Sequence, residues 1–370
     1  MTAAPAPSLR PRRRWWLAPA AAAGLAALAL GWLPTFGKIY RGSNDFLAFY
    51  AGARLVGTPD LYDAEAAREI QASASGMTGN ALRFIRLPFF AAGLWPLGTL
   101  PYPYAYWIFQ GLSLAALAAF LLLWPGDRAA AAVLCCWSVP LSMNLASGQD
   151  VTFLLLWLAL ALRFHGKHPA AAGALLALCA AKFHLFFGLP LLLLAQRRWR
   201  MTAGFAAAGA ALAAVSFAVS GPHWPAQFLA AVTAPSINPG VKAMPNLNGL
   251  LAGAPAAPAL EIALAALTLG LVWRAARRRE FGLAMAAALA GGILVSHHAY
   301  PTDCALLIPA GLLVLDHARQ AWLKWLLVVL LAPFAYFFLL AQIHIGAAAV
   351  PLSLAALVYG LAHEGADARN

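Results

Sequence analysis

Seven polar residues stand out in this 370-residue chain because each interrupts or borders a long apolar run. Two are carboxylates, two are side-chain amides, two are histidines and one is a lysine. They are Asp45, Gln149, Lys182, His184, Asn246, His298 and Asp303. A carboxylate beside apolar walls can act as a general base, and a fixed cation can stabilise negative charge that develops during a reaction. Acid–base chemistry on an anionic substrate is therefore the first hypothesis.

Asp45 follows Asn44 and comes directly before an apolar run that ends at Leu55. One interpretation is an acidic residue at a helix N-terminus, where it complements the helix dipole. The other is a general base just above the membrane, with a pKa tuned by its apolar neighbours. The local sequence leaves both open.

Lys182 and His184 separate two short apolar halves within residues 170–196. Ionisable groups at membrane depth are costly and usually functional. The alternative is that both side chains reach up to the lipid headgroups. Asp150, next to Gln149, fits a helix end as well as it fits a ligand contact.

The segment from Ser296 to Asp303 holds two histidines, Tyr300 and an aspartate. Adjacent histidines point apart on regular structure, so a phosphate or acceptor contact is favoured over a metal site. A polar turn capped by Asp303 remains an alternative. The four cysteines form no metal-binding or disulfide pattern and are interpreted as small buried hydrophobic residues. We predict no metal and no cofactor.

The elements that must position these residues are membrane helices. The chain is 62% hydrophobic and 10% charged, and its mean hydropathy is +0.73. Soluble domains carry about 25% charged residues, so a soluble enzyme, a disordered chain and a fibrous repeat are excluded. We predict an all-α, polytopic integral membrane protein with about 11–12 transmembrane helices, including broken or re-entrant halves.

The predicted organisation is one membrane domain over residues 1–370. It has a first span at 15–33, a long outer loop at 34–103 with amphipathic and re-entrant segments, spans within 104–219, a second outer loop at 220–256, and spans within 257–362.

The net charge of +12 does not indicate nucleic-acid binding, because the basic residues form short clusters between apolar runs. The alternation of spans places 17 Lys and Arg residues on one side and 8 on the other. The richer side is expected to be cytoplasmic and includes the N-terminus. We therefore predict a multi-pass protein of the inner (cytoplasmic) membrane. This topology brings the seven polar residues to its outer, periplasmic face.

Several short motifs occur in an order that resembles glycosyltransferase family 87, integral-membrane enzymes of the GT-C superfamily. They are Asn44-Asp45-Phe46, Ala53-Arg54-Leu55, Leu61-Tyr62-Asp63, Arg86-Leu87-Pro88, Gly148-Gln149, Lys182-Phe183-His184, Asn246-Leu247-Asn248-Gly249-Leu250, and Ser296 to Asp303. The chain departs from the family pattern at Arg86-Leu87-Pro88, where Tyr-Pro-Pro is usual, and at Phe183, His297 and Thr302.

The resemblance implies an inverting enzyme that moves a hexose, mannose by analogy, from a polyprenyl-phosphate donor to a hydroxyl of a lipid or glycan acceptor. It makes Asp45 the general base. It assigns the donor phosphate to Lys182, His298 and Arg86, and other substrate contacts to Gln149, His184, Asn246, Tyr300 and Asp303. The expected partners are the donor, the acceptor and the bilayer, without nucleic acid.

A transporter or flippase is the main alternative, because it too would have broken helices and buried charges. Such proteins place their charges nearer the midplane and often contain repeats, and neither feature is evident in this sequence. A non-catalytic scaffold subunit is a third possibility.

Overall fold

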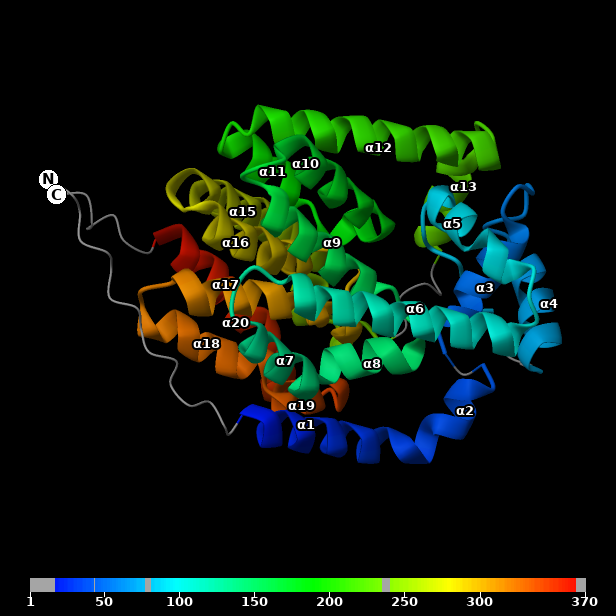
Figure 1. The fold of residues 1–370 in the computed structure, drawn as a ribbon, viewed down its shortest axis with the longest axis horizontal. Coiled ribbons are helices and arrows are strands. Elements are labelled where there is room, and N and C mark those ends of the chain that lie inside the picture. Colours follow the sequence, from blue (N-terminus) through cyan, green and yellow to red (C-terminus); the bar gives the residue numbers. More distant parts are fainter. Residues whose placement is uncertain (1–16, 43, 77–80, 235–239, 364–370) are drawn as a thin grey trace, which may run out of the picture.

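A computed structural model describes residues 17–42, 44–76, 81–234 and 240–363. Within these ranges the chain forms helices joined by short turns and contains no β-strand (Figure 1). The first two residues of the predicted span 15–33 and the N-terminal arginines lie outside the described residues.

The helices of the first half are α1 (Leu17–Trp32), α2 (Phe36–Tyr40), α3 (Phe46–Leu55), α4 (Ala64–Ser75), α5 (Pro88–Gly98), α6 (Tyr102–Leu123), α7 (Arg128–Trp137), α8 (Val139–Ser147), α9 (Val151–Phe164), α10 (Pro169–Leu178), η2 (Cys179–Leu185) and α11 (Gly188–Ala195). Those of the second half are α12 (Trp199–Ser220), α13 (Trp224–Val232), α14 (Leu247–Leu250), α15 (Ala257–Arg278), α16 (Phe281–Val295), η5 (Pro301–Leu306), α17 (Leu307–His317), α18 (Ala321–Leu331), α19 (Pro333–Leu340) and α20 (His344–His363).

Five helices are long and apolar enough to cross a membrane, and there are up to seven candidate spans if each of two bent pairs counts as one. This confirms the all-α, polytopic prediction. The expected 11–12 spans also counted shorter apolar helices such as α9 and α16. Whether these shorter helices cross stays a prediction.

Three apolar segments are broken in the structure, one as predicted and two against the prediction. The expected break between the halves of 170–196 falls at Lys182, where the backbone leaves the helical region (φ −127°, ψ 52°). Two spans predicted as continuous are bent instead, by 68° between α7 and α8 and by 51° between α18 and α19. Pro140 and Pro333 stand in the first turns of α8 and α19, and a proline cannot continue the preceding helix.

Apolar side chains form two buried clusters. The smaller is built on α3, α5 and α6 around Phe46 and Phe109. The larger spans α9, α16, α17 and α20 and includes Val151. In Figure 1, α3, α4 and α5 lie at one end of the molecule and α17, α18 and α20 toward the other. Phe90 on α5 packs against both clusters, so the two are in contact.

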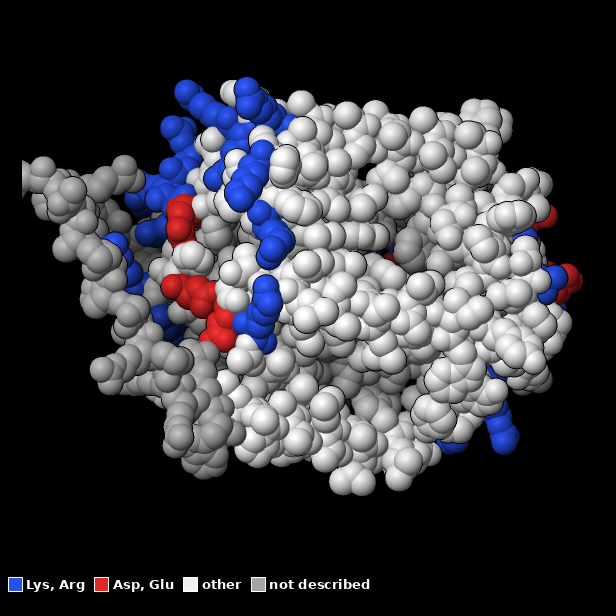
Figure 2. Space-filling view, viewed as in Figure 1, with Lys and Arg blue, Asp and Glu red and all other residues white. Residues whose placement is uncertain are grey.

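Lys and Arg side chains gather at the end of the molecule away from α3 and α4, whereas the flanks carry few charges (Figure 2). Large hydrophobic residues are exposed on these flanks, among them Ile262 on α15 and Trp325 on α18. A wide apolar flank with charged ends is the surface that a bilayer requires.

Candidate active site

The junction between α8 and α9 is the backbone feature on which the candidate site depends. α8 ends at Ser147 and is followed by Gly148, which adopts a left-handed conformation with φ 65°. A Cβ atom at this position would lie 2.7 Å from the Cβ of Phe46. Only glycine accommodates both the conformation and the close approach at low cost. The turn therefore places Gln149 against the start of α3.

Asp45 occupies the position just before α3, but its side chain does not cap that helix. Its backbone N–H donates to the carbonyl of Ser147 (2.8 Å), and its Oδ2 accepts a hydrogen bond from Gln149 Nε2 (2.8 Å). Asp45 therefore stands at the N-terminus of α3, as one interpretation expected, but its carboxylate binds Gln149 and makes no capping hydrogen bond to the helix. Burial raises the pKa of Asp45, although the Gln149 hydrogen bond and the charges of Lys182 and Arg86 oppose this effect.

Four buried charged side chains form a chain of alternating sign. Arg86 binds Asp150 with two nitrogens, at 2.9 Å from Nε and 3.2 Å from Nη2. Lys182 Nζ lies 3.3 Å from Asp150 Oδ1 and 2.6 Å from Asp303 Oδ1, so this lysine lies between the two carboxylates. All four side chains are at most 5% exposed. We call Arg86, Asp150, Lys182 and Asp303 the buried charge chain.

Gln149 connects this chain to Asp45, because its Oε1 accepts a hydrogen bond of 3.1 Å from Arg86 Nη2 while its Nε2 binds Asp45. The Arg86 guanidinium also lies 5.2 Å from the centre of the Phe49 ring on α3. Arg86 stands where the family pattern usually has an aromatic residue. Its guanidinium is held by Asp150, Gln149 and the Phe49 ring.

The two cations predicted to bind a phosphate are ion-paired in the structure. Burying unpaired charges is very costly, whereas alternation of sign compensates each of them. Although burial alone would raise it, Arg86 and Lys182 lower the pKa of Asp150 to about 2. From the sequence alone, Asp150 fitted a helix end as well as it fitted a ligand contact. The partners of Asp150 are 64 and 32 residues away in the chain.

His184, His298 and Tyr300 lie together beside the buried charge chain. The ring centres of His184 and His298 are 6.0 Å apart, and those of His298 and Tyr300 are 4.9 Å apart. Burial lowers the pKa of His298 to about 4, so this side chain is neutral near pH 7. It can therefore offer a hydrogen bond but not the positive charge expected from the sequence.

The loop that carries His298 is fixed at both ends. Asn246 is fully buried, and its amide donates to the carbonyl of Ser296 (2.7 Å) and accepts from the N–H of Gly249 (2.8 Å). Asp303 accepts a hydrogen bond from the N–H of Tyr300 (2.8 Å) in addition to binding Lys182. The polar turn around Asp303 is therefore present, and Asp303 also belongs to the buried charge chain.

All nine predicted site residues lie within this one region, but they differ in accessibility. Five are only partly buried, namely Asp45, Gln149, His184, His298 and Tyr300. Four are buried, namely Arg86, Lys182, Asn246 and Asp303. Among the described residues, no group of three or more His, Cys, Asp or Glu side chains is arranged to hold a metal ion. The arrangement is suited to acid–base chemistry by one partly buried carboxylate, Asp45, which Gln149 links to a fixed set of charges.

Comparison with known proteins agrees with the motif order. No curated protein and no solved structure matches the chain. The sequence model of glycosyltransferase family 87 matches residues 84–297, which is more than half of the chain. The match includes Arg86, Gln149, Lys182 and Asn246; His298 lies one residue beyond its end, and Asp45 lies 39 residues before its start. The chain belongs to glycosyltransferase family 87.

Proposed function

We propose that the protein is an inverting glycosyltransferase that moves a hexose, mannose by analogy, from a polyprenyl-phosphate donor to a hydroxyl of a lipid or glycan acceptor. We place this reaction at the outer face of the cytoplasmic membrane, where the positive-inside rule puts Asp45. Family membership supports the enzyme over the flippase. The observation that carries the proposed mechanism is the half-buried Asp45 carboxylate, which is held by Gln149 and makes no capping hydrogen bond to α3.

The proposed reaction is a single displacement. Asp45 removes the proton from the acceptor hydroxyl as its oxygen attacks the anomeric carbon. The bond between that carbon and the phosphate oxygen breaks, and its electron pair leaves with the polyprenyl phosphate. Attack from the face opposite the leaving group inverts the anomeric centre, so one carboxylate is enough. The raised pKa of Asp45 makes it a stronger base than an exposed aspartate.

The leaving phosphate gains negative charge, and we assign its stabilisation to Lys182, Arg86 and His298. Lys182 and Arg86 would share their charge between the phosphate and the carboxylates they already bind. Fixed dipoles and charges in a poorly hydrated site stabilise such charge more than water does. Neutral His298 would contribute a hydrogen bond.

We assign contacts with the sugar or the acceptor to the remaining half-buried residues, Gln149, His184 and Tyr300. Asn246 and Asp303 act differently in this proposal. Their side chains are occupied by the loop around Ser296–Tyr300 and by Lys182, so they position the contacting residues.

Mass analysis of lipid-linked sugars and envelope glycans, with and without the gene, tests the proposed function. Loss of one hexose from a glycan or lipid, with accumulation of the polyprenyl-phosphate hexose at the outer face, is the expected result. A flippase would instead leave that donor on the inner face, and accumulation there would contradict the proposal.

A further inference from the structure

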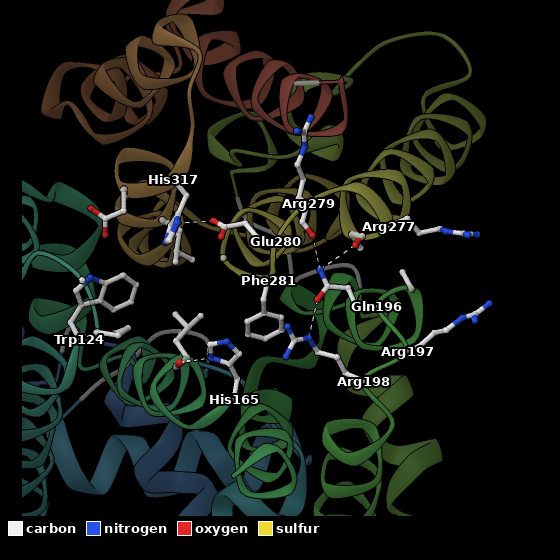
Figure 3. Close-up of a pocket in the computed structure, with 18 residues that line it drawn as sticks. Trp124, His165, Gln196, Arg197, Arg198, Arg277, Arg279, Glu280, Phe281 and His317 are labelled. Atoms are coloured by element: carbon white, nitrogen blue, oxygen red, sulfur yellow. Dashed lines mark hydrogen bonds and ion pairs between the residues drawn. The ribbon is translucent and has the colours of Figure 1, made fainter. Parts of the chain in front are cut away.

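A second site lies far from Asp45, at the end of the molecule where basic residues gather. It is a pocket of about 940 Å³ to which Trp124, His165, Gln196, Arg198 and Phe281 contribute (Figure 3). α6 has 22 residues, and at 1.5 Å per residue it is about 33 Å long. Asn44 binds Tyr102 at the start of α6, and Trp124 follows its last residue, so α6 separates the two sites.

Arg198 is the cation that faces the pocket. Its Nε donates to Gln196 Oε1 (2.9 Å), and its guanidinium lies 4.2 Å from the centre of the Phe281 ring. The His165 ring stacks on the same phenyl ring at 4.7 Å, and Figure 3 shows Phe281 between the two. Within the described part of the chain, the one other polar side-chain interaction of Arg198 is a long contact with the sulfur of Met201. Arg198 is therefore not paired with a carboxylate in that part of the chain.

Gln196 holds Arg198 in place. Its Nε2 donates to the carbonyls of Ala276 (3.1 Å) and Arg279 (3.0 Å) near the end of α15, which leaves Oε1 to accept from Arg198. A guanidinium fixed in this way loses little conformational entropy when it binds a ligand. The site is therefore organised before any ligand arrives.

The rest of the pocket combines an apolar wall with a positive rim. Leu162, Leu313 and Trp124 contribute apolar surface. The acidic Glu280 is engaged by His317 (2.7 Å), and Asp316 also lines the pocket. Arg197 and Arg277 extend away from its centre in Figure 3, where they can attract anions without filling the pocket.

We propose that this pocket binds a phosphate group of an anionic ligand, with Arg198 as the principal contact. A planar guanidinium matches phosphate oxygens, and basic pockets between membrane helices bind anionic lipid headgroups. The phosphate could belong to such a headgroup or to a soluble phosphate compound. The proposal does not depend on the reaction assigned to Asp45.

The test is native mass spectrometry of the full chain, titrated separately with phosphatidylglycerol, phosphatidylcholine and inorganic phosphate. Arg198→Gln removes the fixed charge, and Arg200→Gln is the matched control because it removes an exposed charge in the same segment outside the pocket. Arg198→Lys keeps the positive charge but lacks the planar guanidinium that can bind phosphate through two nitrogens. It replaces Arg198→Gln in the comparison if that variant does not fold.

We expect phosphatidylglycerol to bind about 10-fold more weakly to Arg198→Gln than to the wild type, with a smaller loss for Arg198→Lys. Arg200→Gln should bind like the wild type. Arg198-dependent binding of phosphatidylglycerol alone identifies a lipid headgroup, whereas Arg198-dependent binding of inorganic phosphate identifies a soluble source. Equal affinities of the Arg198 and Arg200 variants for every ligand would overturn the proposal.

Discussion

Gln149 holds Asp45 through a hydrogen bond of 2.8 Å from its side-chain Nε2 to the carboxylate Oδ2. The opposite end of the same amide accepts from Arg86, so the amide cannot rotate without losing both partners. An uncharged donor fixes the carboxylate but leaves it able to take a proton. Gln149 thus relates the position of Asp45 to the buried charge chain.

Gln149→Glu should move the pH dependence of transfer. A carboxylate at position 149 would keep Arg86 as a partner but would repel Asp45 and raise the pKa of Asp45 further. The base works only when ionised, so the acidic limb of the kcat/KM profile should shift to higher pH, by on the order of one pH unit. Gln149→Ala, which adds no charge, is the control. An acidic limb at the wild-type position would show that Asp45 does not set it.

Lys182→Met should destabilise the fold, because the buried carboxylates of Asp150 and Asp303 would both lose the cation that they share. Breaking a buried pair by removing one partner costs about 3–5 kcal/mol. The double variant Lys182→Met/Asp303→Asn should recover most of this loss without recovering use of the donor. Thermal unfolding in detergent measures the first effect and donor kinetics the second. The control is Lys38→Met, which removes the charge of an exposed lysine. Equal unfolding temperatures of Lys182→Met and Lys38→Met would refute the ion-pair account.

Gly148→Ala should disturb the site through the backbone. The added Cβ would meet Phe46 at 2.7 Å in a left-handed conformation, at a cost of about 1–3 kcal/mol. Transfer should fall because Gln149 moves away from Asp45. Gly111→Ala in α6 is the control, since its Cβ would meet nothing within 4 Å and alanine favours the helix. If both variants were as active and stable as the wild type, the Gly148 turn would not be needed.

Single cysteines test the predicted orientation. Gly166→Cys, in the short connection between α9 and α10, should resist an impermeant thiol reagent applied from outside, because that connection is assigned to the cytoplasm. Lys242→Cys, at an exposed position in the second outer loop, should react. Both variants should react after the membrane is opened. The reverse pattern in sealed cells would invert the topology.

The helical class and the break at Lys182 were predictable from the sequence, because apolar runs and isolated polar residues are local signals. The same signals singled out nine polar residues that the fold brings into one region, and their roles stay predictions. The sequence did not predict the role of Asp150, because its ion pairs join segments that only the fold brings together. Aromatic residues show the same limit: in the sequence alone, Tyr50 and Tyr102 fit stacking on a sugar as well as a place at the membrane interface. The structure buries both, with their hydroxyls bound to Leu100 and Asn44. An aromatic residue near a membrane surface has the same sequence signal in the core as in a site.

The same limit applies to charge. Lys182 and Arg86 were predicted as cations for a phosphate, and nothing local indicated that each has a carboxylate partner. The neutral state of His298 likewise follows from its burial. Partners and protonation depend on tertiary contacts, which a single sequence does not specify.

The most direct measurement is the rate of hexose transfer by Asp45→Asn, with purified protein, polyprenyl-phosphate hexose and acceptor. Asparagine keeps the size of the side chain and can still accept the Gln149 hydrogen bond, but it cannot take the acceptor proton. We predict a fall in rate of about 10²–10⁴-fold, with unchanged donor binding and unfolding temperature, while Asp60→Asn at an exposed carboxylate transfers normally. Transfer by Asp45→Asn at close to the wild-type rate would contradict the assignment of Asp45 as the general base.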